Sequence, residues 1–374
     1  MNLYLNTFDD WIFLVFCIAV GIQIIYYWLV FGRFTFYKIP STNKIAEPVS
    51  VVICAKNEFH QLKKNLPLIL EQDYPEFEVV VVNDASDDET IFFLQDMSQA
   101  YKHLKVITLE QDLNFFKGKK FPLAIGIKST KYENLLLTDA DCEPASDQWI
   151  SEMAAGFGDK FEVVLGYGPY HEADGFLNKI IRYETVFTAL QYFSLALWGK
   201  PYMGVGRNLA YKKRLFMEQK GFISHYKVAS GDDDLFINKV AKKSNTSIVL
   251  SPGSFMKSAA KARFSDWWLQ KRRHLSTGKY YKFIHKFILG GYSMSYLLLL
   301  ISFALILIWQ KFILFTLILF GIRLLSQIIL LKFTYDKLEE KKLLLISPFI
   351  ELIITLIYPL MVGLNMVTKE SRWK

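Results

Sequence analysis

The uneven distribution of apolar residues constrains this chain more than any other feature of its sequence. Residues 11–31 form a 21-residue apolar run in which Gln23 is the only strongly polar side chain, and about 20 such residues suffice to cross a bilayer. Further apolar runs lie at 287–309, 312–331 and 343–364. The chain is 52% hydrophobic and 21% charged, too apolar for an ordinary soluble enzyme and too charged for a pure membrane bundle. We therefore expect a polar domain flanked by transmembrane helices.

The first run is either a cleaved signal peptide or a permanent anchor. A signal peptide carries a basic head and ends in small residues at its cleavage site. Here Asp9 and Asp10 precede the run, and the run ends in bulky side chains. We therefore predict that residues 1–32 are an uncleaved N-terminal anchor. Arg33 and Lys38 follow it, so the positive-inside rule places the next segment in the cytoplasm.

The C-terminal part is also predicted to stay at the membrane, which we expect to be a bacterial inner (plasma) membrane. Residues 261–286 are rich in Trp, Tyr, Lys and Arg, which is typical of an amphipathic segment at the membrane interface. Within 287–366, Arg323 and Glu351 are expected to face protein or water, because charge is costly in lipid. The basic tail, residues 367–374, argues against a C-terminus outside the cell, so we expect one of these segments to be re-entrant or interfacial.

The net charge of +8 could indicate a nucleic-acid-binding protein. Many of the basic residues lie beside the apolar runs, however, among them Lys271, Arg272 and Arg273. A basic patch in that position suits contact with anionic lipid headgroups and with pyrophosphate. We therefore expect membrane lipids as partners and no nucleic acid.

The segment between the apolar runs has the pattern of an α/β domain, which we place at residues 45–260. Short apolar runs at 49–54, 78–82, 105–109 and 134–138 alternate with helical stretches. Continuous apolar strands alternating with helices favour a parallel sheet that is covered on both faces. Ligands bind such sheets beyond the carboxyl ends of the strands. The acidic residues that follow the second and fourth strands are therefore expected at one edge.

Asp139-Ala140-Asp141 follows the fourth predicted strand. Two carboxylates at i and i+2 can hold one Mg²⁺ or Mn²⁺, because hard cations prefer oxygen ligands and phosphates can complete the shell. An Asx turn with solvated carboxylates is the alternative interpretation. Gly231-Asp232-Asp233-Asp234 could likewise be the acidic first turn of a helix, a general base that faces an acceptor hydroxyl, or both.

Other segments could contact a nucleotide or a diphosphate. Residues 83–90 are either a plain turn with a helix cap or a loop in which Asp84 accepts a hydrogen bond from uracil or ribose. Lys117-Gly118-Lys119-Lys120 could reach a nucleotide or its phosphates, or could lie in a solvated loop. Gln270 and Arg273 are neighbours at helical spacing and could meet a pyrophosphate together, or could belong to a lipid-contacting cluster.

Seven motifs follow one another along the chain: Lys56-Asn57-Glu58, Asn83-Asp84-Ala85-Ser86, Gly118-Lys119, Asp139-Ala140-Asp141, Gly204-Val205-Gly206-Arg207-Asn208, Asp232-Asp233 and Gln270-x-x-Arg273. Their order resembles that of the family 2 inverting glycosyltransferases with a GT-A fold. This group includes the cellulose, hyaluronan, chitin and poly-N-acetylglucosamine synthases. The resemblance covers about residues 45–280.

The resemblance implies a metal-dependent glycosyltransferase that uses a UDP-sugar, with Mg²⁺ or Mn²⁺ as the cofactor. It implies that Asp233 is the general base with Asp232 beside it, and that Asp141 and Asp139 hold the metal. The residues implied in donor-nucleotide binding are Ala55, Glu58, Asp84, Lys119 and Asp139. Those implied at the diphosphate or the acceptor are Gly206, Arg207, Asn208, Gln270, Arg272 and Arg273.

One departure from the family pattern concerns the product. Processive members carry Gln-x-x-Arg-Trp, whereas this chain has His274 in place of the Trp, and its C-terminal apolar runs are few for a polymer channel. We therefore expect transfer of one or a few sugars to a lipid-linked or membrane-adjacent glycan acceptor at the cytoplasmic face. The alternatives are a processive polysaccharide synthase and, outside this class, a non-catalytic membrane scaffold or transport subunit, which the intact acidic motifs disfavour.

Overall fold

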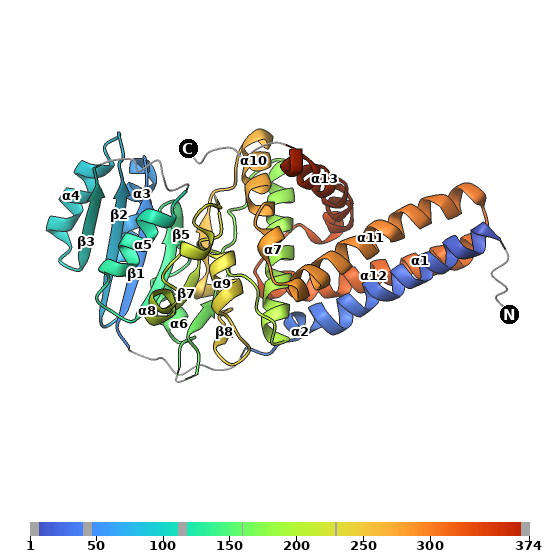
Figure 1. Ribbon diagram of the computed structural model, residues 1–374, viewed down its shortest axis with the longest axis horizontal. Helices are drawn as coiled ribbons and strands as arrows, with labels where there is room; N and C mark the ends of the chain where they lie inside the picture. Colours follow the sequence, from blue (N-terminus) through green and yellow to red (C-terminus); the bar gives the residue numbers. More distant parts are fainter. Residues whose placement is uncertain (1–6, 40–46, 111–117, 159, 229, 368–374) are drawn as a thin grey trace. The chain divides into compact units, whose positions relative to one another are not determined.

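The computed structural model describes residues 7–39, 47–110, 118–158, 160–228 and 230–367. The predicted basic tail lies outside the described residues, apart from Val367. Two compact units make up the chain (Figure 1). The helical unit comprises Met1–Tyr37 and Tyr281–Leu364, and the sheet unit comprises Lys38–Tyr280 and Asn365–Lys374.

The sheet unit is built on a seven-stranded sheet with the strand order β3-β2-β1-β4-β7-β6-β8. Its first four strands along the chain pair in parallel, β7 runs antiparallel to both of its neighbours, and β6 pairs with β8 in parallel. The predicted α/β class with a mainly parallel central sheet is therefore confirmed. The strands are β1 (Val49–Ala55), β2 (Phe77–Asp84), β3 (Leu104–Leu109), β4 (Asn134–Asp139), β6 (Val163–Leu165), β7 (Leu209–Lys212) and β8 (Thr246–Ile248), with β5 (Cys142–Pro144) and β9 (Met256–Ser258) forming a separate antiparallel pair.

Helices cover both faces of the parallel half of this sheet. Alternate side chains of a strand point to opposite faces, so each strand contributes apolar residues to the packing on both sides. Val51 and Val81 share one core with the helices that follow β1 and β2. On the other face α5 lies so close to the sheet that a Cβ added to Gly126 would be 2.8 Å from Val52 and 2.9 Å from Val82. The helices of the unit are α3 (Phe59–Leu70), α4 (Thr90–Ala100), α5 (Lys120–Ser129), α6 (Trp149–Ala154), α7 (Phe176–Leu197), α8 (Lys213–Glu218), α9 (Asp234–Val240) and α10 (Phe264–Leu275).

The sheet reverses its winding direction between β1 and β4. From β1 the chain adds β2 and then β3 on one side, and β4 then pairs on the other side of β1. Ligands of open α/β sheets bind at such a switch point, beyond the carboxyl ends of the strands. Ala55 lies opposite Asn83 and Cys54 lies opposite Asp139, so the residues that follow β1, β2 and β4 share one edge.

The helical unit contains four helices that are long and apolar enough to cross a membrane, judged by length and composition over the described residues. This arrangement is compatible with a multi-pass membrane protein. The first span joins three segments, α1 (Phe8–Ile25), the π-helical η1 (Tyr26–Phe31) and α2 (Gly32–Thr35). The others correspond to α11 (Phe283–Trp309), α12 (Ile313–Lys337) and α13 (Ser347–Val367).

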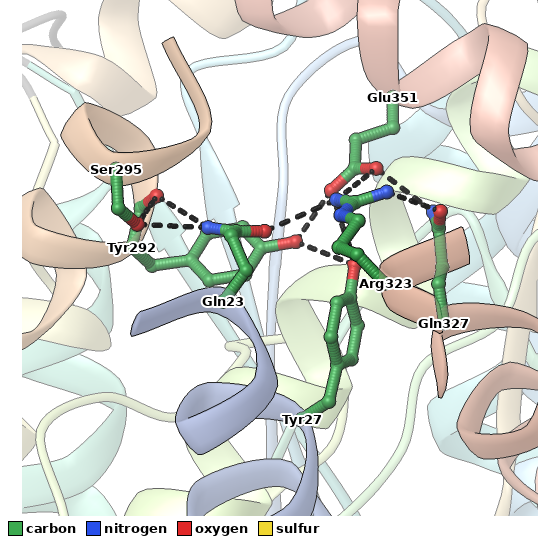
Figure 2. Close-up of polar contacts among 7 residues, drawn as sticks. All are labelled: Gln23, Tyr27, Tyr292, Ser295, Arg323, Gln327 and Glu351. Atoms are coloured by element: carbon green, nitrogen blue, oxygen red, sulfur yellow. Dashed lines mark hydrogen bonds and ion pairs between the residues drawn. The ribbon is translucent and has the colours of Figure 1, made fainter. Parts of the chain in front are cut away.

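A buried network of polar side chains, the membrane-helix network, joins all four spans of this unit (Figure 2). Arg323 on α12 forms an ion pair of 2.8 Å with Glu351 on α13. The same guanidinium nitrogen donates to Gln23 Oε1 (3.1 Å) and to the Tyr27 hydroxyl (3.0 Å), both on the first span. The seven members of the network are Gln23, Tyr27, Tyr292, Ser295, Arg323, Gln327 and Glu351.

The network gives the polar groups of these helices partners inside the protein. Gln327 accepts from Arg323 Nη1 (2.6 Å) and donates to Glu351 Oε2 (2.8 Å). On α11, the Tyr292 hydroxyl donates to Glu351, and Ser295 Oγ accepts from the Gln23 side-chain amide at 2.8 Å. Lipid offers no hydrogen bonds, so such groups must be satisfied within the protein. The first span is thus an integral part of this helical unit.

We predict that the Arg323–Glu351 pair is a stability determinant. Arg323→Met or Glu351→Gln should lower the free energy of unfolding by about 3–5 kcal/mol, because removing one partner leaves the other charge buried and uncompensated. The double variant should cost less than the sum of the two. Thermal unfolding of the purified protein in detergent measures this.

Lys332→Met is the matched control, because Lys332 pairs with Asp336 on the same helix where both side chains are 56% exposed. Its effect should be small. Equal melting temperatures for Arg323→Met and Lys332→Met would contradict the prediction.

Candidate functional site

Lys119 lies at the centre of the candidate site. It directly precedes α5, and its Nζ is 2.7 Å from Asp139 Oδ1 and 3.1 Å from Asp232 Oδ2. The chain turns into this position at Gly118, whose φ of 79° suits glycine. Burial disfavours the charged form of Lys119, but the neighbouring carboxylates outweigh it and hold its pKa well above the ordinary range. Lys119 thus ties the end of β4 to the acidic segment before α9.

Asp233 is both the N-cap of α9 and a wall of this site. Its Oδ1 accepts from the Asp234 backbone N–H and its Oδ2 from the Gly206 N–H, each at 2.7 Å. A Cβ added to Gly206 would be 3.2 Å from Asp233 Oδ2 and 3.4 Å from Lys119 Nζ, which explains why the smallest residue stands there. The helix-cap interpretation of this acidic run is therefore confirmed, while the general-base interpretation stays a prediction.

The three consecutive carboxylates of the run have different surroundings. Burial, and then the charges of Asp232 and Asp234, raise the pKa of Asp233 to about 7. Lys119 outweighs the effect of burial on Asp232 and lowers the pKa of that carboxyl group. Asp234 is buried and accepts a hydrogen bond from the Thr277 hydroxyl. Asp232 and Asp233 line a small cavity together with Lys119, Asp139 and Gly206.

Asp139, Asp141 and Cys142 bring candidate ligand atoms within 4.8 Å of one another. The two carboxylates suit a hard divalent cation. Burial raises the pKa of the Cys142 thiol well above its ordinary range, so the thiol stays protonated and does not suit Mg²⁺ or Mn²⁺. Burial, followed by the charge of Asp139, raises the pKa of Asp141, and a divalent cation would relieve this repulsion. The carboxylates present therefore fit Mg²⁺ or Mn²⁺.

The loops after β1 and β2 are hydrogen-bonded to each other. Asn57, whose φ is 55°, donates its N–H to Ser86 Oγ (2.9 Å) and accepts from the Asp87 N–H (2.8 Å). Asp84 ends β2, and Ala55 ends β1 beside it in the sheet. The predicted nucleotide-binding positions thus lie on the edge that carries Asp139.

Glu58 belongs to the loop after β1 and is electrostatically linked to the metal-site carboxylates. Burial, and then the charge of Asp141, raise the pKa of Glu58 to about 7. Asp139 contributes in the same direction, while Lys261 opposes it. Glu58 therefore belongs to the acidic surroundings of Asp139 and Asp141, and its predicted role in nucleotide binding stays a prediction.

Arg207 and Asn208 differ in the roles that their surroundings allow. The Arg207 guanidinium lies 4.0 Å from the centroid of the Tyr170 ring and donates to Ser258 Oγ at 2.6 Å. Asn208 is fully buried, and it donates to the backbone carbonyls of residues 167 and 254 and accepts from the Trp149 indole N–H. The Asn208 side chain is therefore occupied in holding the fold, and its implied place at the acceptor stays a prediction.

The helix α10 carries Gln270 and Arg273 and is fixed by a buried ion pair. Lys271 Nζ is 2.8 Å from Glu184 Oε1 on α7, and the Trp267 indole N–H donates to the same carboxylate at 3.2 Å. The sequence motifs did not identify Glu184, because it lies in an apolar helix far from α10 in the chain. Figure 1 shows α7 and α10 side by side.

The basic residues of α10 face different surroundings. Arg272 exchanges two hydrogen bonds with Asn365, which occupy its Nε and its carbonyl, and its implied role at the diphosphate stays a prediction. Arg273 Nε is buried without a hydrogen-bond partner among the described residues, so this nitrogen is available to a ligand. His274, which replaces the Trp of processive enzymes, is exposed.

Comparisons with known proteins agree with this geometry. Residues 50–219 match the family described as "Glycosyl transferase family 2". An uncharacterized glycosyltransferase of Haemophilus influenzae is 28% identical over 41% of this chain and 44% of its own length. The poly-beta-1,6-N-acetyl-D-glucosamine synthase of Staphylococcus epidermidis is 28% identical over 31% of this chain and 29% of its own length. The chain thus spans less than half the length of these curated relatives.

A solved structure establishes the fold. The mannosyltransferase of Pyrobaculum calidifontis, in complex with GDP-Man and Mn²⁺, superposes with a TM-score of 0.59 over 93% of this chain and 98% of that protein, at 17% sequence identity. An identity this low speaks to the fold alone. The predicted GT-A fold is therefore confirmed.

We predict that Asp141→Asn weakens Mn²⁺ binding in the presence of UDP. The affinity should fall by more than the roughly tenfold that loss of an outer-shell partner costs, because a candidate ligand is removed. Isothermal titration calorimetry with MnCl₂ measures this. Asp147→Asn, an exposed site six positions further on, is the control, and equal Mn²⁺ affinities for the two variants would contradict the assignment.

Proposed function

We propose that this chain, whose residues 50–219 are a family 2 glycosyltransferase domain within a GT-A fold, transfers a sugar from a UDP-sugar to an acceptor hydroxyl with inversion. The observation that carries the proposal is the convergence of Asp139, Asp232 and Asp233 around Lys119 at the switch point of the sheet. Such an edge can hold a nucleotide diphosphate on one side and a general base on the other.

The leaving diphosphate develops negative charge, which the site must stabilise. Asp141 and Asp139 would hold Mg²⁺ or Mn²⁺, and the ion would neutralise part of this charge. From α10, Gln270 and Arg273 would donate hydrogen bonds to the diphosphate. Arg273 supports this role, because its Nε has no hydrogen-bond partner in the described part of the chain. Electrostatic stabilisation of this kind is commonly the largest contribution to catalysis.

Asp233 would act as the general base. As the acceptor oxygen bonds to the anomeric carbon, the bond from that carbon to the diphosphate oxygen breaks, and the hydroxyl proton passes to the Asp233 carboxylate. The hydrogen bonds from the Gly206 and Asp234 N–H groups hold this carboxylate in place. Its raised pKa suits a group that accepts a proton near neutral pH.

The acceptor is proposed to be a lipid-linked or membrane-adjacent glycan at the cytoplasmic face. The four apolar helices found among the described residues support a membrane location, and the basic residues that follow the first span support the cytoplasmic side. The exposed Phe264 and Leu269 of α10 suit contact with the membrane interface.

A processive polysaccharide synthase is the second candidate, favoured by the similarity to poly-beta-1,6-N-acetyl-D-glucosamine synthase. His274, which stands where the processive pattern has Trp, disfavours it. Incubating the purified protein with MnCl₂ and a panel of UDP- and GDP-sugars, and sizing the labelled products, tests both. Products longer by one or a few sugars support the proposal, long polymers support the synthase, and the absence of metal-dependent transfer from every nucleotide sugar refutes both.

We predict that Asp233→Asn reduces turnover by about 10²–10⁴-fold, the range of general-base contributions. Affinity for UDP and Mn²⁺ should stay within about twofold, because Asn caps helices as well as Asp does and Asp233 is not one of the proposed metal ligands, Asp139 and Asp141. Steady-state kinetics and calorimetry provide the two readouts. Turnover close to that of the Asp147→Asn control would rule out Asp233 as the base.

We also predict that kcat/KM rises with pH. The ionised carboxylate of Asp233 is the active form, and its pKa is raised to about 7, so activity should fall about tenfold per pH unit below that value and level off above it. A profile measured from pH 5.5 to 8.5 in saturating Mn²⁺ checks this. A flat profile across that range would contradict the expected ionisation.

A further inference from the structure

Lys120, the residue after the central lysine of the site, makes an unusual set of contacts. It is the first residue of α5, and its side chain is buried. Its ammonium donates to three backbone carbonyls of one loop, those of His225 (3.0 Å), Val228 and Ser230 (2.6 Å). Three carbonyls match the three N–H donors of a lysine ammonium.

The loop that Lys120 binds leads directly into the acidic run of the site. Ser230 is followed by Gly231, whose φ of 101° favours glycine, and then by Asp232 and Asp233. Only one residue therefore separates the last carbonyl held by Lys120 from Asp232. The loop lies between α8 and α9, and within it the short 3-10 turn Ile223–His225 is the only regular element among the described residues.

Lys119 and Lys120 together hold this segment in two ways. Lys119 contacts the Asp232 side chain, and Lys120 contacts the backbone just before it. Both lysines stand at the N-terminal end of α5, which packs closely against β1 and β2 through Gly126. These contacts thus fix the position of Asp232 and Asp233 relative to the sheet that also carries Asp139.

We propose that Lys120 is a positioning residue that sets the place of the general-base segment, residues 230–233, relative to the end of β4. The inference rests on the proposed function, because it assigns Lys120 to the same reaction. Lys120 touches no reacting atom in this assignment. Its effect on the reaction passes through Asp233, whose distance from the acceptor hydroxyl must be held closely for proton transfer.

A positioning role predicts a specific kinetic signature for Lys120→Met in the full-length protein. The donor site on Asp139 and Asp141 should be unchanged, so KM for the UDP-sugar and affinity for UDP with Mn²⁺ should stay within about twofold. Misplacing the base should lower kcat by about 10–100-fold. Lys120→Arg retains a charged donor and should recover most of that loss.

Lys128→Met is the matched control, because Lys128 stands in the last turn of the same helix, is exposed, and loses the same charge when substituted. Hydrogen–deuterium exchange of the loop, residues 223–232, gives a readout that does not depend on turnover. Lys120→Met should increase exchange there relative to Lys128→Met and leave β1 and β4 unchanged.

The outcomes separate this inference from the proposed function. An active wild type with equal kcat and equal loop exchange in Lys120→Met and Lys128→Met overturns the role of Lys120 alone. A parallel loss of UDP affinity and kcat in Lys120→Met, without rescue by Lys120→Arg, overturns it in favour of a merely structural role. A wild type inactive with every nucleotide sugar refutes the proposed function, while the exchange data still decide whether Lys120 orders the loop. Should Lys120→Met fail to fold, Lys120→Gln is measured in the same way.

Discussion

The pairing of Lys119 with two carboxylates is the interaction on which the candidate site depends. Asp139 ends a central strand, while Asp232 belongs to a loop almost a hundred residues later, and one ammonium contacts both. Without this cation, the acids gathered at the switch point would repel one another. The Lys119 charge allows Asp232 to stay ionised while its neighbour Asp233 holds a raised pKa. Two adjacent acids thus acquire the different protonation behaviour that separate tasks require.

At the same edge of the sheet, the parts proposed to bind the nucleotide and the diphosphate are held in place by separate contacts. The proposed nucleotide-binding side is formed by two loops that are hydrogen-bonded to each other through Asn57 and Ser86. The segment proposed to meet the diphosphate, α10, is fixed by the buried Lys271–Glu184 pair. These supports come from different elements of the sheet unit, and the central sheet fixes their positions relative to one another. The proposed chemistry therefore depends on packing that lies well outside the cavity itself.

Several parts of this arrangement could be predicted from the sequence, and the reasons are local. The parallel strands are continuous runs of β-branched and aliphatic residues, so their places and the acids at their ends are apparent from pattern alone. Strands β6, β7 and β8 have three or four residues each, too few for a periodic signal. The role of Asn208 was missed because its partners, among them Trp149, are brought to it only by the fold. Glu184 escaped notice for the same reason, since its partner is far away in the chain. Lys120 was expected to reach a phosphate or to lie in a solvated loop, because the distant loop that it binds could not be identified from the sequence.

The membrane-helix network has a consequence for how the protein is made. Gln23 emerges from the ribosome 300 residues before Arg323, to which it is hydrogen-bonded in the finished structure. At about 5–20 residues per second, that separation corresponds to roughly 15–60 s of synthesis. Throughout this interval the Gln23 side chain lacks its hydrogen-bond partners on the later helices. The network can therefore be completed only after residues 38–280 of the sheet unit and the later helices have been translated.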